Sequence, residues 1–196
     1  SELADDLRYW SLSAATYVYY VTICAVIKKY ACGKTLDAGA GRLNGKLLLR
    51  DHVTEYTSMD VSDANGMIDI VSDIQNMAGI PGDTFATVYS SQVLEHVPNP
   101  CKALAEIHRV LVPGGHAIIS VPLLSGLHEE PHDYYRYTPY GLKYLMQEAG
   151  FTVEEECTAG GLCCFLAHPF SLVFICMCWS IPVLRWVAWW INKLLF

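Results

Sequence analysis

The sequence predicts an α/β protein whose mostly parallel sheet is covered by helices on both faces. Short apolar segments of strand length alternate with segments of helical periodicity between residues 34 and 157, as is typical of parallel sheets. The first strand segment ends in the glycine-rich "LDAGAG" (36–41), which predicts a turn into a helix. With 196 residues, of which 53% are hydrophobic, the chain is long enough for one domain with a sizeable core.

Each element follows from its local pattern. Residues 3–30 carry apolar side chains three and four positions apart, which predicts one or two helices covering the sheet. Strands are expected near 34–38, 55–60, 67–72, 85–91, 116–122 and 151–157. Helices or helical turns are expected near 43–50, 99–111 and 138–149, with "PGG" (113–115) as the turn that ends the second of these. The chain then divides into an N-terminal helical cover (1–33), a ligand-binding domain (34–160) and an apolar C-terminal extension (161–196).

Composition excludes several classes of protein. Thirteen Lys and Arg residues against twenty Asp and Glu residues give a net charge of −7 without a basic run, so we expect no nucleic-acid partner. The eight cysteines contain no CxxC pair, which predicts reduced, mostly buried thiols in a cytoplasmic protein. Lipidation of Cys163 and Cys164 is the alternative. No signal peptide is visible, and the acidic "HEEPHD" (128–133) fits no metal-binding template, so we expect no metal.

In a parallel α/β sheet, ligands bind beyond the carboxyl ends of the strands. "LDAGAG" lacks the third glycine of a dinucleotide fingerprint, and no phosphate-binding GxxxxGK[ST] follows it. An acid nevertheless precedes the GxG, and Asp60 ends the next strand about twenty residues later. An acid there is suited to accept hydrogen bonds from the two hydroxyls of a ribose. The structural alternative is that the glycines form only a tight turn and that Asp60 and Asp73 only cap helices.

These motifs resemble those of class I S-adenosylmethionine-dependent methyltransferases. Within that superfamily, the chain is similar to the small type 11 methyltransferase domains found among bacterial polysaccharide and surface-glycan genes. The resemblance is carried by "LDAGAG", "MDVSD" (59–63), "SDIQNMAG" (72–79), the long block from "FATVYSS" to "IISVP" (85–122) and "LHEEPHDYYRYTPYGLKYLMQEAGF" (127–151). It implies a Rossmann-like class I methyltransferase fold over residues 34–160 and S-adenosylmethionine as the cofactor. The acceptor it implies is a hydroxyl group of a glycan, a glycolipid or a related small metabolite.

The resemblance also assigns the cofactor residues by position. It places Asp37, Gly39, Ala40 and Gly41 at the methionine end, Asp60 and Val61 at the ribose, Asp73 and Ile74 at the adenine, and Ser90, Ser91 and Gln92 near the sulfonium. The family's third glycine is Leu43 here, with Gly45 displaced, which predicts a slightly different start of the following helix.

The acceptor side is expected in two segments, "LEHV" and "EEPHDYYRYT". Candidate catalytic residues are His132, Asp133 and His96, with His132 as the general base because a histidine titrates near neutrality. Tyr135 and Arg136 are the candidate substrate-binding residues, since arginine can hold an acidic acceptor with two hydrogen bonds. In the alternative interpretation, His96 caps or packs a helix and the tyrosines belong to the core.

The C-terminal extension is unusually apolar. Residues 162–184 contain no Asp, Glu, Lys or Arg, and four tryptophans (Trp179, Trp186, Trp189 and Trp190) lie in or beyond this run. Tryptophan is typical of membrane interfaces, so we expect attachment to the cytoplasmic face of a membrane, where a lipid-linked acceptor can be reached. The alternatives are a tail folded over the domain and a homodimer contact. The rival functions are a non-catalytic cofactor-binding or membrane-scaffold protein that keeps the methyltransferase fold, and a nicotinamide oxidoreductase.

Overall fold

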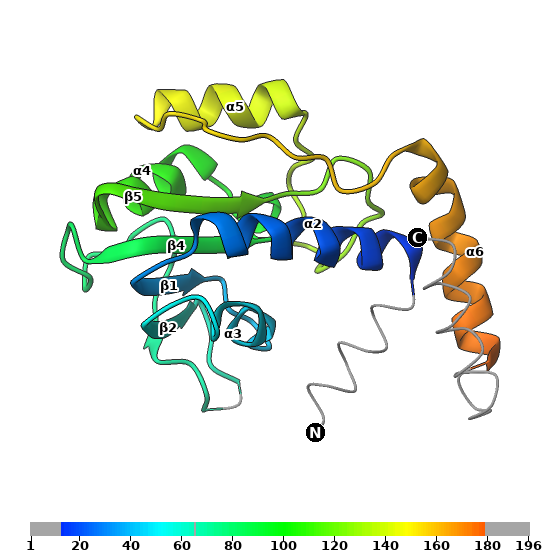
Figure 1. Cartoon of the computed structure of the whole chain (residues 1–196), viewed down its shortest axis with the longest axis horizontal. Helices are drawn as coiled ribbons and strands as arrows, with labels where there is room; N and C mark the ends of the chain where they lie inside the picture. The colour runs from blue at the N-terminus through cyan, green and yellow to red at the C-terminus, as the bar shows by residue number, and fades with distance from the viewer. Residues whose placement is uncertain (1–12, 65, 179–196) are drawn as a thin grey trace. The chain divides into compact units, whose positions relative to one another are not determined.

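A computed structural model describes residues 13–64 and 66–178 of the chain (Figure 1). Two compact units are present: residues 26–156 form one, and residues before 26 and after 156 belong to the other. The candidate site lies within residues 26–156. The tryptophans of the predicted membrane contact, residues 179 to 190, lie outside the described part of the chain.

The larger unit is built on a parallel five-stranded sheet with the order β3-β2-β1-β4-β5. The strands are β1 (Lys34–Ala38), β2 (Glu55–Asp60), β3 (Ile70–Val71), β4 (Phe85–Ser91) and β5 (Leu111–Ser120). All neighbouring pairs are parallel, with Asp37 of β1 opposite both Ser58 of β2 and Tyr89 of β4. The carboxyl ends of the strands therefore meet at one edge of the sheet, which confirms the predicted Rossmann-like class.

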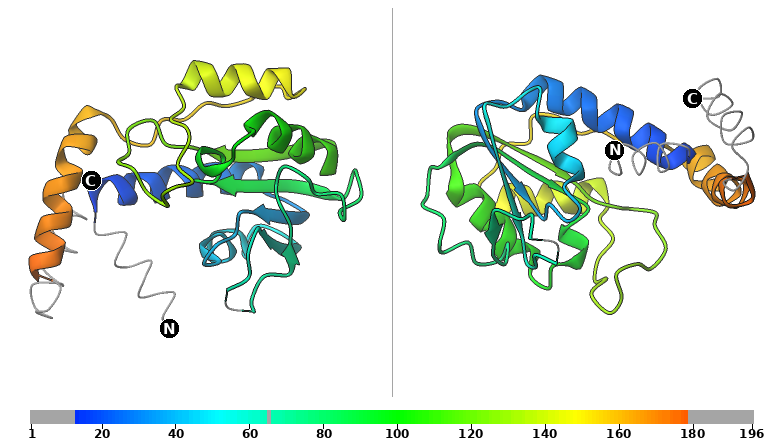
Figure 2. Two further views of the ribbon diagram at one scale, coloured as in Figure 1. Left: turned by 180° about the vertical axis from the view of Figure 1, so that it is seen from behind. Right: turned by 90° about the horizontal axis from the view of Figure 1, so that it is seen from below.

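Helices cover both faces of this sheet. Helix α3 (Asn44–Leu49) and the last turns of α2 (Ala14–Tyr30) lie on one face, and α4 (Pro100–Val110) lies on the other (Figures 1 and 2). Helix α5 (Pro139–Glu148) packs beside α4. Asn99 and Thr138 are the N-caps of α4 and α5, and each is followed by a proline in the first turn. Their side chains accept hydrogen bonds from backbone N–H groups of these helices.

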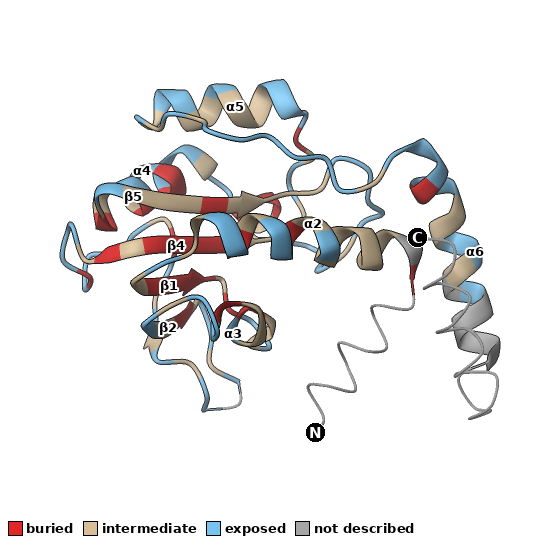
Figure 3. Cartoon of the chain, viewed as in Figure 1, coloured by how far each residue is buried: buried red, intermediate tan, exposed pale blue. Residues whose placement is uncertain are grey.

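The core lies between the sheet and α4. Helix α4 is amphipathic and buries Ala103, Leu104, Ile107 and Val110 against Leu36, Val88 and their neighbours. Figure 3 shows the buried residues concentrated on β1, β4 and the inner side of α4. Such a rigid platform fixes the loops that follow β1, β2 and β4, on which the candidate site depends.

Two predicted features of the sheet are wrong. "PGG" does not form a turn after α4, because β5 begins at Leu111, directly after the helix, and runs through these residues. The ladder shifts register there, and a Cβ on Gly115 would lie 2.9 Å from the Ala86 carbonyl oxygen, so the glycines permit an irregularity within a strand. Residues 151–157, expected as a strand, form no ladder. Their acids instead hold neighbouring helices: Glu155 pairs with Lys29 and Glu156 with Lys143.

The smaller unit contributes α6 (Leu162–Cys178), which carries Pro169 inside it. Several of its apolar side chains are exposed, among them Phe165, Leu166, Phe170 and Val173. None of the described helices has the length and apolar character required to cross a membrane. The thiols were expected to be mostly buried, and this is wrong for the described cysteines: Cys24, Cys32, Cys101 and Cys163 are free and exposed, whereas Cys164 is free and buried.

Candidate functional site

The loop after β1 is held between the ends of β2 and β4. The backbone N–H groups of Gly39 and Ala40 donate to the Met59 carbonyl at 2.8 and 2.9 Å. On the other side, the Ser90 hydroxyl donates to the Ala38 carbonyl at 2.9 Å. Because both neighbours are strands of the rigid sheet, the GxG loop has one defined position at its carboxyl edge.

The two glycines of this loop have different roles. Gly39 adopts φ +89°, and a Cβ on it would lie 2.3 Å from the Cγ2 atom of Val93. The space that this glycine leaves is thus filled by Val93, and not by a ligand as the motif suggests. Gly41 also has positive φ, +49°, but a Cβ there would meet nothing within 4 Å. Of the two, Gly41 is the glycine that leaves open space at the edge of the sheet.

Asp60 closes the loop from the end of β2. Its Oδ2 atom accepts a hydrogen bond of 2.8 Å from the Gly41 N–H, and its Oδ1 atom accepts one of 3.2 Å from the Ser62 N–H. The half-buried carboxylate lies beside the open space at Gly41, where it can accept hydrogen bonds from a ribose. Val61 follows with its side chain 71% exposed, so an apolar surface is available next to this acid.

Asp37 lies beneath the loop. Its side chain is buried and accepts a hydrogen bond of 2.6 Å from the Tyr56 hydroxyl. Burial and, to a smaller extent, the nearby Asp60 raise the pKa of Asp37 to about 7, although this hydrogen bond lowers it. A Cβ on Gly45 would lie 2.2 Å from the Asp37 Oδ2 atom. The displaced glycine therefore has a specific use: it leaves room for this carboxylate.

The residue before the following helix has an unusual backbone conformation. Leu43, which stands in place of the family's third glycine, precedes α3 in the left-handed region at φ 61°. A branched apolar residue rarely adopts this backbone conformation. The loop retains the turn that a glycine would give at this position.

Asp73 and Ile74 follow β3. The Asp73 carboxylate accepts hydrogen bonds from the backbone N–H and the side-chain amide of Gln75. The Gln75 Oε1 atom accepts in turn from the Asn99 N–H at 3.0 Å. Asp73 is exposed, whereas the Ile74 side chain is buried in the core. Of this pair, the Asp73 carboxylate is the group available to a ligand.

The residues predicted to lie near the sulfonium of the cofactor stand at the end of β4. Gln92 adopts φ 56° and donates through its backbone N–H to the Ser120 carbonyl at 2.9 Å. Its side-chain amide donates to the Ser120 hydroxyl at 3.1 Å, and Ser91 also contacts that hydroxyl at 3.2 Å. Gln92 is thus fixed at the junction of β4 and β5, two residues before the short helix η1 (Leu94–His96) begins.

The segment after β5 docks on η1. The N–H groups of Tyr134 and Tyr135 donate to the Glu95 carbonyl at 2.8 and 3.2 Å. The Tyr137 hydroxyl donates to the Leu94 carbonyl at 2.9 Å, and Tyr137 is buried. The two segments in which acceptor-side residues were expected, "LEHV" and "EEPHDYYRYT", are therefore brought together by backbone hydrogen bonds.

Arg136 and Asp133 form a bidentate ion pair. The guanidinium NH1 and NH2 groups lie 2.6 and 2.8 Å from the two carboxylate oxygens. Its remaining hydrogen bonds go to the carbonyls of Tyr135, Ser125 and Gly126. The guanidinium holds the pKa of Asp133 well below its usual range. All five N–H donors of Arg136 thus have partners within the protein, so Arg136 organises this loop and presents no unpaired donor to an acceptor.

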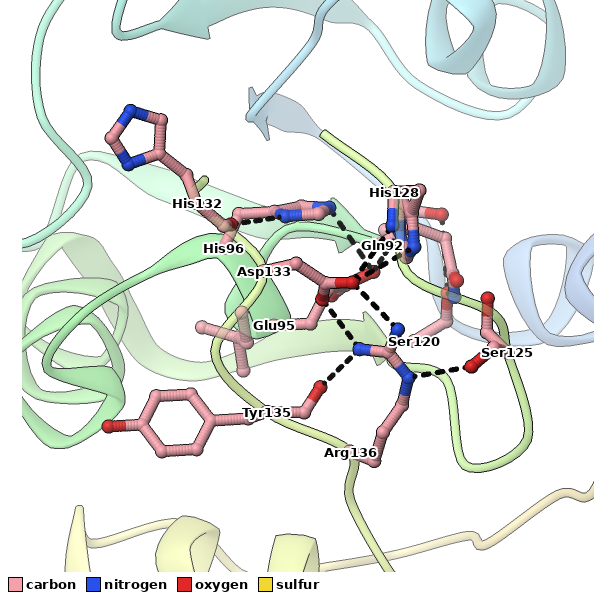
Figure 4. Close-up of polar contacts among 12 residues, drawn as sticks. Gln92, Glu95, His96, Ser120, Ser125, His128, His132, Asp133, Tyr135 and Arg136 are labelled. Atoms are coloured by element: carbon pink, nitrogen blue, oxygen red, sulfur yellow. Dashed lines mark hydrogen bonds and ion pairs between the residues drawn. The ribbon is translucent and has the colours of Figure 1, made fainter. Parts of the chain in front are cut away.

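The histidines are arranged differently from the expectation. The His132 imidazole points away from Glu95 (Figure 4), and its Nδ1 atom lies 3.0 Å from the Tyr134 hydroxyl. Its carbonyl oxygen lies 2.7 Å from Nδ1 of His96. His96 ends η1, and its Nε2 atom lies 3.8 Å from Oε1 of Glu95. His96, and not His132, therefore faces a carboxylate next to the end of β4.

Comparison with known proteins identifies the family. Residues 23–156 match the model of the methyltransferase domain family, which covers more than half of the chain. The chain belongs to this methyltransferase family. Its cofactor is S-adenosylmethionine, as the resemblance of the motifs implied. Among curated proteins, none matches the chain.

Solved methyltransferases share the fold at low sequence identity. One is 1,6-didemethyltoxoflavin-N1-methyltransferase of Burkholderia thailandensis with bound S-adenosylhomocysteine (TM-score 0.63, 20% identity, 76% of this chain and 73% of that chain). Others are S-adenosylmethionine-dependent methyltransferases of Mesorhizobium loti (0.56, 17%, 76% and 88%) and Archaeoglobus fulgidus (0.54, 16%, 80% and 87%). At these identities the similarity shows the fold alone.

Two residues of this methyltransferase were not predicted for the site. Glu95 is fully buried, and burial raises its pKa. His128 lies with its Nε2 atom 3.8 Å from Oε1 of Glu95, and its backbone N–H donates to Asp133 at 2.9 Å. The adjacency of Glu95 to His96 was visible in "LEHV". The contact of Glu95 with His128, 33 positions further along the chain, depends on the docked loop and has no local sequence signal.

Proposed function

We propose that this methyltransferase transfers the methyl group of S-adenosylmethionine to a hydroxyl of a glycan, a glycolipid or a related small metabolite. The methyl group of a sulfonium is already activated, so the protein must align the acceptor and receive its proton. A hydroxyl is a poor nucleophile until that proton is removed or weakened. A site for hydroxyl methylation therefore needs proton-accepting groups on the acceptor side.

The proposal rests on a cluster of proton-accepting side chains near the end of β4. Glu95 Oε1 lies 3.8 Å from Nε2 of both His96 and His128. These three residues follow Gln92, which stands where the family resemblance puts the sulfonium. The Asp133 carboxylate, by contrast, is neutralised by Arg136. The proton-accepting capacity thus lies in Glu95, His96 and His128, and we assign His132 a positioning role through its carbonyl.

The exposed aromatic residues of the docked loop are consistent with a sugar-like acceptor. Tyr134 and Tyr135 are partly exposed, and their rings lie 6.3 Å apart. A tyrosine offers an apolar face and a polar edge, which suits an acceptor that has both ring faces and hydroxyl groups. Tyr135 is anchored by its hydroxyl, which donates to the Pro98 carbonyl at 3.0 Å.

We also propose that the enzyme works at the cytoplasmic face of a membrane. The exposed apolar side chains of α6 support this location, because apolar surface of this kind inserts into the headgroup region. A lipid-linked glycan is an acceptor that occurs at such a membrane. A homodimer in which a second copy covers α6 is the alternative that a membrane-binding experiment distinguishes.

The experiment that tests the acceptor class uses S-adenosylmethionine with a labelled methyl group. The full chain is incubated with glycolipid, polysaccharide and small-metabolite fractions of the source cells, and labelled products are treated with mild alkali. Methyl ethers and methylated amines survive this treatment, whereas methyl esters release methanol, so the surviving products are then identified by mass spectrometry. We expect alkali-stable label in a hydroxyl-rich fraction. Label found only in esters, amines or protein contradicts the proposal.

A further inference from the structure

The His96 ring is oriented by a backbone carbonyl. Its Nδ1 atom lies 2.7 Å from the His132 carbonyl oxygen. A carbonyl can only accept a hydrogen bond, so Nδ1 must carry the proton. In the neutral imidazole, Nε2 then has a free lone pair, and this atom is the one that lies 3.8 Å from Oε1 of Glu95.

The His128 ring is oriented in the same way. Its Nδ1 atom lies 3.1 Å from the Gly126 carbonyl oxygen and 3.5 Å from Oδ2 of Asp133. Both are acceptors, so Nδ1 again carries the proton and Nε2 has the lone pair. This Nε2 atom lies 3.8 Å from the same Oε1 of Glu95. The two rings stand edge to face with centroids 4.7 Å apart, so two lone pairs converge on one carboxylate oxygen (Figure 4).

The Glu95 carboxylate has no hydrogen-bond donor to offer the two histidines, and no donor from the described residues reaches it. Its side chain has no exposed surface, and within the described part of the chain neither carboxylate oxygen has a hydrogen-bond partner. The nearby guanidinium of Arg136 is engaged by Asp133 and by backbone carbonyls. A buried carboxylate without a donor is costly, and three acceptors that face one another need a shared proton or a metal cation between them.

We propose that Glu95, His96 and His128 bind a divalent transition-metal cation. Their ligand atoms all lie within 4.8 Å of one another. Two imidazoles and one carboxylate are a ligand set suited to zinc and to other first-row divalent metals, and three protein ligands leave coordination positions open. With bonds of roughly 2.0–2.2 Å, the ligand atoms need to approach by about 1 Å.

The surrounding contacts are those of a supported metal site. Metal-binding histidines typically donate their second ring N–H to a carbonyl or carboxylate, which fixes the ring. His96 does so to the carbonyl of His132, and His128 does so to that of Gly126. Asp133, fixed by Arg136, accepts the backbone N–H of His128. This assigns Asp133 and Arg136 as positioning residues for His128.

A role for the cation follows if the proposed function holds. A hydroxyl oxygen of the acceptor would occupy an open coordination position, and the cation would lower the pKa of that hydroxyl. Because their lone pairs then bind the cation, Glu95, His96 and His128 act through it and do not take the proton themselves. The proton leaves to water, the new carbon–oxygen bond forms, and the methyl–sulfur bond breaks to leave a neutral thioether. The sequence prediction of no metal considered only "HEEPHD", of which the proposed site uses His128 alone.

Binding of the metal itself tests this inference, without cofactor or acceptor. The full chain, freed of metal with a chelator, is titrated with Co²⁺ and with Zn²⁺. We expect one Co²⁺ per chain with a visible absorption spectrum, displaced by one Zn²⁺. In Glu95→Gln and His128→Gln, affinity should fall at least tenfold. His52→Gln, at an exposed turn residue outside the cluster, is the matched control and should bind like the natural chain.

Glu95→Gln separates loss of ligand from loss of fold. Its side-chain amide can donate to the histidine lone pairs, so the metal-free variant should melt no lower than the metal-free natural chain.

Absence of stoichiometric Co²⁺ or Zn²⁺ binding, or equal binding by the natural chain and both ligand variants, overturns the metal site and leaves a shared proton as the explanation. Methyl ethers formed in excess chelator would overturn the metal's role while the hydroxyl acceptor stands. Stoichiometric metal binding supports the site even if the acceptor proves not to be a hydroxyl.

Discussion

The Asp37 carboxylate occupies the space that a Cβ on Gly45 would fill, since that atom would lie 2.2 Å from Asp37 Oδ2. We therefore predict that Gly45→Ala forces the buried carboxylate from its position and destabilises the protein by about 1–3 kcal/mol. Gly79→Ala is the control, because a Cβ there would meet nothing within 4 Å. Denaturant unfolding measures both. Equal unfolding free energies of the two variants would show that displacing the Asp37 carboxylate does not destabilise the protein.

Asp37 also predicts a pH dependence of stability. Its pKa is about 7 in the folded protein and about 4 in an unfolded chain, so between these values the folded state holds a proton that the unfolded state has lost. The free energy of unfolding therefore decreases with rising pH: the contribution of Asp37 to stability falls by a few kcal/mol between about pH 4 and about pH 7.

Asp37→Asn cannot ionise, so it should lack this decline while its amide oxygen still accepts from the Tyr56 hydroxyl. Unfolding free energies at pH 5 and pH 7 measure the difference, with the exposed Asp51→Asn as control. If the natural chain and Asp37→Asn lose the same stability between these two pH values, the buried carboxylate does not bind the proton.

Arg136 is predicted to hold the loop after β5. Arg136→Lys keeps the charge but removes the planar pair of hydrogen bonds to Asp133 and most contacts to the carbonyls of Ser125 and Gly126. We expect a loss of about 1–3 kcal/mol and faster amide hydrogen exchange in residues 125–136. Arg50→Lys, at an exposed position, should change neither. If amide exchange in residues 125–136 is unchanged in Arg136→Lys, the guanidinium does not hold this loop.

Membrane attachment is tested on α6. Phe170→Gln combined with Leu166→Gln removes two exposed apolar side chains, and we expect the double variant to float with liposomes several-fold less than the natural chain. Tyr140→Gln, also highly exposed but in the larger unit, serves as control. Because the chain carries a net charge of −7, flotation should depend little on salt. A natural chain that stays in the soluble fraction contradicts the proposed location.

Much of the fold could be predicted because its signals are local. The alternation of strands and helices, the loop after β1 and the acid that ends β2 are visible in short segments, and the structure contains them at the expected positions. The failed strand at 151–157 has a β-like pattern but no neighbouring strand. "PGG" suggested a turn because a turn and a strand irregularity use the same residues. The pairing of Asp37 with Gly45 depends on helix placement, which sequence periodicity does not resolve.

The acceptor side was less predictable for a physical reason. His132 was selected because of its intrinsic pKa, yet the docked loop turns its ring away and uses its carbonyl to orient His96. Glu95 was overlooked because a buried acid and an exposed acid look identical in a sequence. Which side chains converge is decided by tertiary hydrogen bonds such as those from Tyr134 and Tyr135 to the Glu95 carbonyl.

The assignment of the cofactor site is tested by titration calorimetry of the natural chain and of Asp60→Ala with S-adenosylhomocysteine. Asp60 lies beside the open space at Gly41 and offers two carboxylate oxygens to a ribose. Losing these hydrogen bonds should weaken binding at least tenfold, as expected for about 1.5–3 kcal/mol each. Asp51→Ala, in the exposed turn before β2, should bind like the natural chain. We predict one site per chain that is weakened only in Asp60→Ala; equal affinity in all three proteins would contradict the assignment of the cofactor site.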